Sequence, residues 1–316
     1  MAETNEPMTR RRDHASLAAR RRANFVIFLG PAIALTALFF VIPVFIDIAV
    51  SFTDLDRTLR LNKLTIEQYQ RVFHGDQRLP QVIGLTFIYV LGTLAIFNVT
   101  FGLVLALTTT SLNKMSGGFF RGVWLLPRMS PSVLYILLWL WVINPSDVGL
   151  LNQFLTQLLG LPKPLDLMTR TPVALIIIAN GFVGASMGMI IFTAAIRGIP
   201  EHLFYAADID GAGTLAKIRF ITLPALRWPI SFVTIYQTLS LLVSFEYILL
   251  LTKGGPFYDT TVYALYVYRR AFASGQYGYG AALALFLILI GVVVALLGWR
   301  FFDLERLLQR PRIEVH

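Results

Sequence analysis

The chain has no cysteine and only four histidines. The absence of cysteine from all 316 residues excludes disulfides, thiolate metal sites and cysteine nucleophiles. The four histidines, His14, His74, His202 and His316, show no spacing typical of a metal site. The phosphate-binding pattern G-x-x-x-x-G-K-[ST] is also missing. We therefore expect no catalytic residues, no metal and no cofactor bound by this chain.

Charged residues are scarce as well. They make up 14% of the chain, hydrophobic residues make up 56%, and the mean hydropathy is +0.66. This composition is too apolar for an ordinary soluble domain and is typical of a membrane protein. The net charge of +9 does not indicate nucleic-acid binding, because the basic residues flank apolar stretches instead of forming a face interleaved with aromatic side chains. Lipid is the expected surrounding, and nucleic acid is not an expected partner.

Six stretches are long and apolar enough to cross a bilayer as helices, which takes about 20 residues each. They are Phe25 to Phe52, Val82 to Thr110, Val123 to Ile143, Pro172 to Ile196, Ile230 to Leu251 and Ala281 to Phe302. The sequence thus predicts an all-α, polytopic membrane protein with one six-helix domain over residues 25–302. A basic arm (1–24) precedes this domain and a tail (303–316) follows it. The first apolar run is too long for a cleavable signal peptide, so we expect it to remain.

Lysine and arginine gather on one side of the predicted membrane. That side carries Arg10, Arg11, Arg12, Arg20, Arg21, Arg22, Lys114, Arg121, Arg197, Lys217, Arg219, Arg227, Arg300, Arg306, Arg310 and Arg312. The positive-inside rule predicts that both termini and these connections are cytoplasmic, and that the connections 53–81, 144–171 and 252–280 face outward. Binding of anionic lipid or of a partner is the alternative for the arginine clusters of the arm.

Prolines in or beside the spans predict kinked helices. Pro31, Pro43, Pro127 and Pro131 free backbone carbonyls that neighbouring helices or a cavity must satisfy. Kinks suit a gated pathway, although proline is frequent in membrane helices generally.

A polar, glycine-containing loop (197–224) separates the fourth and fifth predicted spans. Pro200 and Glu201 are typical of a helix start, whereas Gly211 interrupts the helix, so the pattern predicts a short helix over Glu201 to Asp208. Apolar and aromatic side chains there could anchor a partner, and small ones would let it approach closely. From the residues alone, this helix either lies on the lipid surface or docks another protein.

The loop also has a distinctive spacing: Ala-Ala, three residues, Gly, nine residues and Ile-x-Leu-Pro, ending at Pro224. This spacing resembles the EAA loop of permease subunits from binding-protein-dependent ABC importers. Further features are similar to the carbohydrate-permease branch, which includes the maltose and glycerol-phosphate systems. They are Gly30-Pro31, Pro43, Ser51-Phe52-Thr53-Asp54, Leu125-Leu126-Pro127, Pro131, Trp139, Asn144-Pro145, Phe245-Glu246 and Leu251-Thr252-x-Gly254-Gly255-Pro256.

The resemblance implies the type I importer permease fold, a place in the inner (plasma) membrane, and a sugar, polyol or glycoside as cargo. It implies a second, similar permease in a heterodimer, two ATPase subunits that hold ATP and Mg, and an extracytoplasmic solute-binding protein. The short loop helix would be the coupling helix that sits in a cleft of the ATPase. The implied coupling residues are Glu201, Phe204, Tyr205, Ala206, Ala207, Asp208, Asp210 and Gly211. Tyr205 replaces the leading glutamate of the family, so an ionic contact there is not implied.

Polar residues within the spans indicate where cargo could pass. An ionisable group in hydrocarbon usually faces a cavity or a partner, which makes Glu246 the sharpest candidate. We expect it near a polar stripe at helical spacing in the fifth span, with Tyr236 or Tyr247 stacking on a sugar ring. The full set of cargo candidates is Arg128, Asn180, Tyr236, Gln237, Ser240, Ser244 and Glu246.

Helix packing is the competing explanation for several of these residues. It explains the serines equally well, and it explains Gly181, Gly184 and Gly188 better than a cargo site does. If Arg128 lines the cavity, an anionic sugar derivative is a plausible cargo beside a neutral one.

Two other function classes remain open from the residues. A secondary carrier would use Glu246 as a proton-coupling carboxylate. A membrane enzyme or scaffold would need a catalytic constellation that the sequence does not contain. The run from Gly211 to Ala216 matches a dinucleotide-binding pattern only superficially, because no buried strand precedes it.

Overall fold

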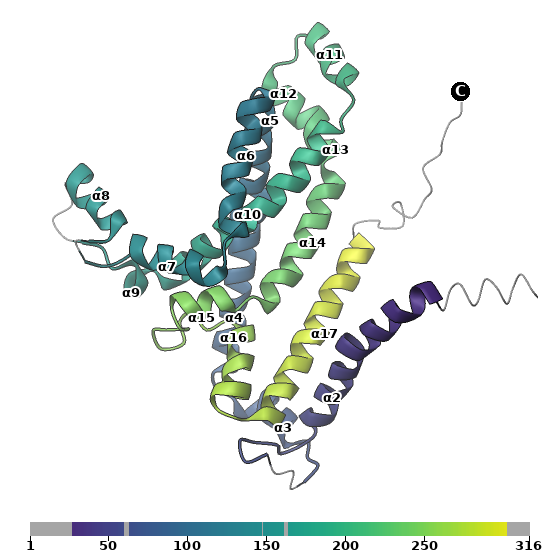
Figure 1. Ribbon diagram of the computed structural model, residues 1–316, viewed down its shortest axis with the longest axis vertical. Coiled ribbons are helices and arrows are strands. Elements are labelled where there is room, and N and C mark those ends of the chain that lie inside the picture. The colour runs from purple at the N-terminus through teal and green to yellow at the C-terminus, as the bar shows by residue number, and fades with distance from the viewer. Residues whose placement is uncertain (1–26, 60–62, 147, 161–163, 302–316) are drawn as a thin grey trace, which may run out of the picture.

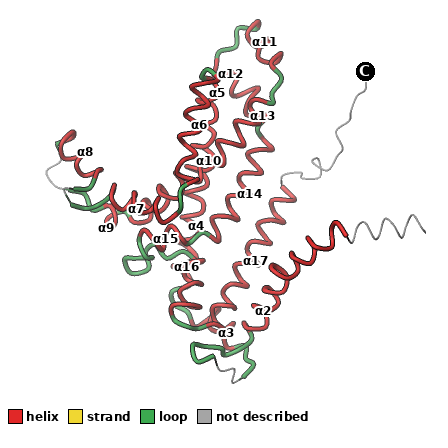
Figure 2. Tube along the Cα trace, viewed as in Figure 1, coloured by secondary structure: helices red, strands yellow, loops and turns green. Residues whose placement is uncertain are grey.

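The computed structural model describes residues 27–59, 63–146, 148–160 and 164–301 (Figure 1). The predicted basic arm (1–24) and tail (303–316) lie outside these ranges. Figure 2 shows helices joined by loops, with no strand, in these ranges. The only β-type pairing among these residues is an isolated bridge between Thr53 and Leu64. The all-α prediction is confirmed.

Four helices are continuous and are long and apolar enough to cross a membrane: Ile27–Ser51, Leu79–Ser111, Pro172–Arg197 and Tyr277–Arg300. They correspond to the first, second, fourth and sixth predicted spans. Two further candidates are bent pairs: Lys114–Met129 with Ser132–Val142, bent by 101°, and Thr214–Ala225 with Arg227–Val243, bent by 63°. The described residues therefore contain four spans, or six if each bent pair counts as one.

The helical elements follow one another from the first span to the last. In order they are η1 (Ala37–Val41), α2 (Ile42–Ser51), α3 (Glu67–Gln70), η2 (Arg71–Gly75), α4 (Leu79–Gly92), η3 (Thr93–Phe101), α5 (Gly102–Ser111), α6 (Lys114–Met129), α7 (Ser132–Val142), α8 (Leu150–Leu159), α9 (Leu167–Arg170), α10 (Pro172–Arg197), α11 (Glu201–Ile209), α12 (Thr214–Lys217), η4 (Ile218–Thr222), α13 (Leu223–Ala225), α14 (Arg227–Val243), α15 (Glu246–Leu251), α16 (Tyr263–Tyr268), η5 (Arg269–Ala273) and α17 (Tyr277–Phe301). The η segments have π-helical geometry. We refer to the two ends of the bundle as the α11 end and the α3 end (Figure 1).

The third predicted span, Val123 to Ile143, is wrong as a single helix. α6 ends at Met129, the Ser130 backbone is extended with ψ 144°, and Pro131 directly precedes α7. Proline disfavours helical geometry in the residue before it, which explains the break at Ser130.

The fifth predicted span, Ile230 to Leu251, is also wrong as a single helix. α14 ends at Val243, and Glu246 starts the separate helix α15. No proline or glycine stands at this break. The extended backbone of Ser244 (φ −76°, ψ 114°) is instead held from outside, because its hydroxyl accepts a hydrogen bond from the Asn180 amide of α10 at 3.0 Å.

α10 is the central helix of the bundle. Its apolar window is 61% buried, compared with 0% for the first span. It packs against η3, α5 and α14, and glycines make this approach close. A Cβ atom on Gly188 would lie 2.3 Å from the main-chain oxygen of Asn98. The structure thus agrees with helix packing as the role of this glycine.

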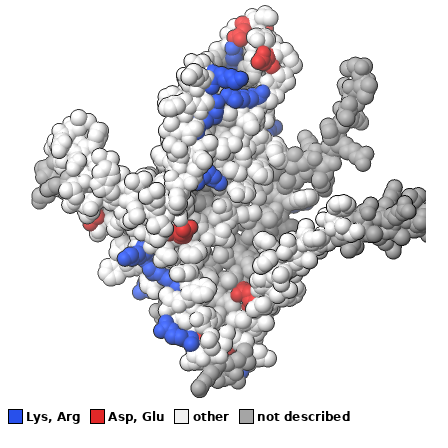
Figure 3. All heavy atoms as spheres, viewed as in Figure 1, with Lys and Arg blue, Asp and Glu red and all other residues white. Residues whose placement is uncertain are grey.

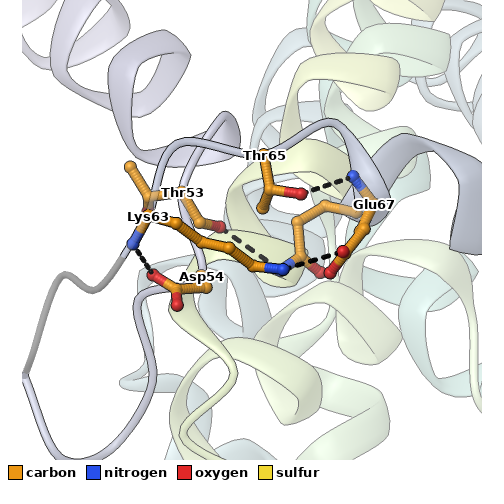
Figure 4. A network of polar contacts seen from close by, with 6 residues as sticks. Thr53, Asp54, Lys63, Thr65 and Glu67 are labelled. Carbon is orange, nitrogen blue, oxygen red and sulfur yellow. Dashed lines mark hydrogen bonds and ion pairs between the residues drawn. The ribbon is translucent and has the colours of Figure 1, made fainter.

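The connection after the first span folds back on itself at the α3 end (Figure 4). The Lys63 ammonium pairs with Glu67 at 2.8 Å, and the Lys63 backbone N–H donates to Asp54 at 3.2 Å. The Thr65 hydroxyl accepts from the Glu67 backbone N–H at 3.1 Å. This loop also reaches the last span, because the Gly278 N–H donates to the Leu55 carbonyl at 2.9 Å.

A buried carboxylate joins three segments at the same end. Asp76, just before α4, accepts hydrogen bonds from the hydroxyls of Tyr266 on α16 and Tyr279 on α17, the latter at 2.6 Å. Arg270 lies 3.7 Å from the same carboxylate, whose side chain is 4% exposed. Burial raises the pKa of Asp76, but these hydrogen bonds, the Arg78 backbone N–H and the Arg270 charge together bring it below its ordinary value.

This cluster predicts a stability that depends on acid pH. Because the pKa of Asp76 is lower in the folded chain than in the unfolded chain, its stabilisation is present above about pH 4 and is lost as the pH falls through the folded value. We expect Asp76→Asn to lower the free energy of unfolding by about 1.5–3 kcal/mol at neutral pH. We also expect the free energy of unfolding of this variant to depend less on pH in the acid range than that of the wild type. Thermal unfolding in nanodiscs between about pH 3 and pH 7 measures both effects. Glu67→Gln, in an exposed ion pair, is the control and should change little; parallel pH profiles of wild type and Asp76→Asn would contradict the prediction.

Candidate functional site

The loop predicted between the fourth and fifth spans forms a distinct helix at one end of the bundle. α11 starts after Pro200 and contains no buried residue (Figure 1). It ends in a Schellman turn: Gly211 has φ +73°, its N–H donates to the Asp208 carbonyl at 3.1 Å, and the Ala212 N–H donates to the Ala207 carbonyl at 2.8 Å. The local prediction of a short, glycine-terminated helix is confirmed.

Several large apolar side chains of this loop are exposed. Tyr205 is 63% exposed, Ile209 88%, Leu215 78% and Phe220 71%. Large apolar side chains exposed close together in the sequence are typical of a protein or membrane interaction site. Leu215 and Phe220 are absent from the predicted coupling set, although both lie within the loop (197–224) that the sequence singled out.

The structure places the predicted coupling residues on and around α11. Glu201, Tyr205, Ala206, Asp208, Asp210 and Gly211 are exposed, whereas Phe204 and Ala207 are half-buried. The Tyr205 hydroxyl donates to the Glu201 carboxylate one turn earlier, at 3.3 Å. Glu201 therefore shares a face of α11 with Tyr205.

Charge is separated at the α11 end. Figure 3 shows acidic groups on α11 and basic groups directly beneath it, over the ends of the neighbouring helices. The exposed acids are Glu201, Asp208 and Asp210, and the exposed bases nearby in the fold are Lys114, Arg197, Arg219 and Arg227. α11 is thus an acidic, partly apolar helix that projects from a surface carrying basic residues.

The two helix breaks meet each other in the middle of the molecule. The hydroxyl of Ser132, the first residue of α7, donates to the carboxylate of Glu246, the first residue of α15. On the other side of the second break, the Asn180 amide contacts both Ser244 and the hydroxyl of Tyr89. Side chains from α4, α7, α10 and α15 therefore fix the geometry of both breaks.

The predicted polar stripe of the fifth span is wrong as a single surface, because the helix does not continue past Val243. Gln237 is 5% exposed and donates to the Gly184 carbonyl at 2.9 Å, so it joins α14 to α10. Tyr236 points to another face, where its ring stacks on Phe232 with an interplanar angle of 13°. Ser240 is exposed.

The remaining cargo candidates do come together. Asn180, Ser244 and Glu246 surround the second break, and Arg128, on the last turn of α6, is close enough to Tyr247 for an electrostatic interaction. Sequence reasoning missed Ser132 and Tyr89. Ser132 follows Pro131 directly, so the proline is a local signal that could have found it. Tyr89 carries no such signal, because only the fold brings it to Asn180.

An aromatic groove adjoins these residues on the inner side of the bend between α6 and α7. Its volume is about 400 Å³, and Ser130 and Pro127 lie at the bend itself. Three aromatic rings, those of Tyr135, Trp139 and Phe182, line it. The Tyr135 ring also lies 5.9 Å from that of Tyr247, centroid to centroid, which joins the groove to the α15 side. An aromatic side chain in such a groove can bind the apolar face of a sugar ring. Among the described residues, no group of three or more histidines or carboxylates is arranged to hold a metal.

Comparisons with known proteins agree with this architecture. The family described as "Binding-protein-dependent transport system inner membrane component" matches residues 98–301. A probable ABC transporter permease protein of Pyrococcus horikoshii is 32% identical over 290 residues, covering 89% of this chain and 97% of the relative. The multiple sugar-binding transport system permease protein of Streptococcus mutans is 32% identical over 284 residues, covering 85% and 92%.

A solved structure shows the same fold. It is a chain from the bacterial alginate ABC transporter in complex with an alginate pentasaccharide-bound periplasmic protein, with a TM-score of 0.76 and 24% identity. The match covers 88% of this chain and 93% of that chain, which confirms the predicted fold of an importer permease. The family match extends from η3 to α17 and so includes α11, α10 and both helix breaks. The chain therefore belongs to the family of inner membrane components of binding-protein-dependent transport systems.

Proposed function

We propose that this chain is the permease subunit of an ABC importer for carbohydrates. The observation that carries the proposal is the exposed α11 projection, whose spacing and apolar surface suit a cleft in an ATPase subunit. The relative from Streptococcus mutans, named for multiple sugar binding, supports a sugar, polyol or glycoside as cargo. In this proposal ATP and Mg bind the ATPase subunits, and this chain has no catalytic role.

The proposed orientation puts the α11 end in the cytoplasm, together with both termini. A second, similar permease completes the pore as a heterodimer, two ATPase subunits bind at the α11 end, and an extracytoplasmic solute-binding protein binds at the α3 end. The basic residues Lys114, Arg197, Arg219 and Arg227 near α11 support this orientation. Closure of the ATPases on ATP would bias the permease between two states through α11.

Reconstitution tests the proposal directly. We expect ATP-dependent uptake of a labelled sugar in proteoliposomes that contain this chain together with the second permease, the ATPase and the binding protein. An ion gradient without ATP should give no uptake. Uptake by this chain alone on a proton gradient would instead support the secondary carrier, which the family membership of the chain disfavours.

We propose that cargo passes between the two helix breaks. Glu246 and Ser244 would hydrogen-bond sugar hydroxyls, with Asn180 holding Ser244 in place, and the ring of Trp139, which is half-buried in the groove, would stack on a sugar face. Arg128 at the end of α6 would favour an anionic sugar derivative. Tyr236, Gln237 and Ser240 have weaker support, because the first two have other contacts and the third no described partner at the breaks.

Removal of the Glu246 charge tests this path. We expect Glu246→Gln to raise the KM for uptake by about tenfold or more, because a hydrogen bond to a charged group contributes roughly 1.5–3 kcal/mol, and to leave assembly with the ATPase intact. Initial uptake rates at several sugar concentrations measure the change. Asp259→Asn removes the same charge from an exposed loop beside α16 and should behave as wild type. Normal uptake kinetics in Glu246→Gln would remove this residue from the cargo site.

A further inference from the structure

α11 is held in space by very few contacts. It has no buried residue, and within the described part of the chain it packs extensively against no other element. Its two ends are turns, at Gly198 before the helix and at Gly211 after it. Hydrogen bonds within the Schellman turn fix the local backbone, but they do not fix how α11 is inclined to the helices that follow.

An ion pair crosses this turn. The Asp208 carboxylate on the last turn of α11 pairs with the ammonium of Lys217, the last residue of α12. Among the described residues, this is the only ion pair between α11 and another element. The Lys217 side chain is only 22% exposed, although lysine normally extends into solvent, so it is held against the loop.

Lys217 also belongs to a continuous path into the fifth span. α12 runs directly into η4 and α13, and α14 begins two residues after α13 ends, at a bend of 63°. The ion pair between Asp208 and Lys217 therefore connects the C-terminal turn of α11 to the segment that leads into α14. The turn at Gly211 and this ion pair are two separate connections between α11 and the segment that follows it. Together they restrict the angle between α11 and that segment more than the turn alone would.

We infer that Asp208 and Lys217 form a strut that sets the inclination of α11, and that Asp208 is a positioning residue instead of a direct contact for the ATPase. The consequence for transport rests on the proposed function, because only a docked partner would push on α11. The strut itself is a property of this chain alone. Lys217, which sequence reasoning did not single out, thereby becomes part of the coupling loop.

Hydrogen exchange on the full chain in nanodiscs tests the strut without any partner. We expect Asp208→Lys and Lys217→Asp each to speed amide exchange in Glu201–Ile209 by about two- to fivefold, the range that corresponds to losing one partly exposed ion pair. The double variant Asp208→Lys with Lys217→Asp, which swaps the two charges, should restore amide hydrogen exchange to a rate close to that of the wild type. Exchange in α10 should not change in any of these variants.

A matched double variant separates the pair from net charge. Asp208→Lys with Arg219→Asp has the same formal charge as the exchanged pair, but Arg219 is exposed and its guanidinium lies over the ring of Phe220 at 5.6 Å. In this control variant, amide hydrogen exchange in Glu201–Ile209 should be as fast as in Asp208→Lys alone. The strut would be overturned if both single variants had the wild-type rate of amide hydrogen exchange in Glu201–Ile209. Equal rates in the two double variants would overturn it as well.

The assembled transporter gives the second measurement. The single variants should transport several-fold less sugar per ATP hydrolysed while the KM for ATP stays constant, and the exchanged pair should restore the ratio. Restored exchange without a restored ratio would overturn the role of the strut in coupling. Failure of any ATPase to assemble with the wild-type chain would overturn the proposed function instead, and the exchange results would still decide whether the strut exists.

Discussion

Gly211→Leu is expected to reduce transport per ATP hydrolysed by about tenfold while leaving ATP hydrolysis in place. Gly211 has φ +73°, and a left-handed conformation is disfavoured for a non-glycine residue by about 1–2 kcal/mol. A Cβ atom added there would meet nothing within 4 Å, so we expect the backbone conformation, and not a clash of that atom, to cause the effect. The Schellman turn would open and α11 would leave its position. Parallel measurement of sugar uptake and phosphate release in proteoliposomes gives the ratio.

Two variants control this experiment. Gly213 lies in the same loop, also has open space around its Cβ position, and has φ −70°, so Gly213→Ala should keep normal coupling. Gly211→Asn should be milder than Gly211→Leu, because asparagine tolerates the left-handed region. If Gly211→Leu and Gly213→Ala behaved alike, the turn geometry would not be what couples α11 to transport.

Gly188→Ala should prevent normal assembly of the helical core, although it adds a single methyl group. The new Cβ atom would lie 2.3 Å from the main-chain oxygen of Asn98, and a main-chain atom cannot rotate away as a side chain can. α10 and η3 would have to separate, with a loss of about 1–3 kcal/mol or more. The yield of monodisperse protein in detergent and its thermal midpoint measure this loss.

Other glycines provide graded controls. Gly184→Ala would bring its Cβ to 2.1 Å from the Asn98 Oδ1 atom, which belongs to a side chain, so we expect a smaller loss than at Gly188. Gly122→Ala on α6 meets nothing within 4 Å and should be neutral or slightly stabilising, because alanine favours a helix more than glycine does. Equal stability of the Gly188 and Gly122 variants would contradict the close approach of α10 and η3.

The spans were predictable because hydropathy depends on composition along a window. The same property hid the breaks: a window from Val123 to Ile143 has the same mean hydropathy whether its helix is straight or bent by 101°. Pro131 indicated a kink, but a proline does not specify the angle. At Ser244 no local signal exists, because the partner that holds the break, Asn180, stands 64 residues away.

The two candidate sites differed in the same way. The α11 loop was predictable in detail because its signals, Pro200 and Gly211, act on their own neighbours. The polar stripe failed because it extended a helical period across a break, which assigned Gln237 and Ser244 to one surface. Its members depend on contacts from α7 and α10 that the sequence does not place.

The turns on either side of α11 have a mechanical consequence. α10 ends at Arg197, just before α11, and α12, η4 and α13 connect α11 to α14. Both α10 and α14 are therefore connected to α11. Asn180 on α10 and Ser244 just after α14 are hydrogen-bonded to each other. A displacement of α11 would therefore be transmitted to the Asn180–Ser244 contact through both α10 and α14. Because the two connections differ in length, α10 and α14 would shift by different amounts and slide past each other at this contact.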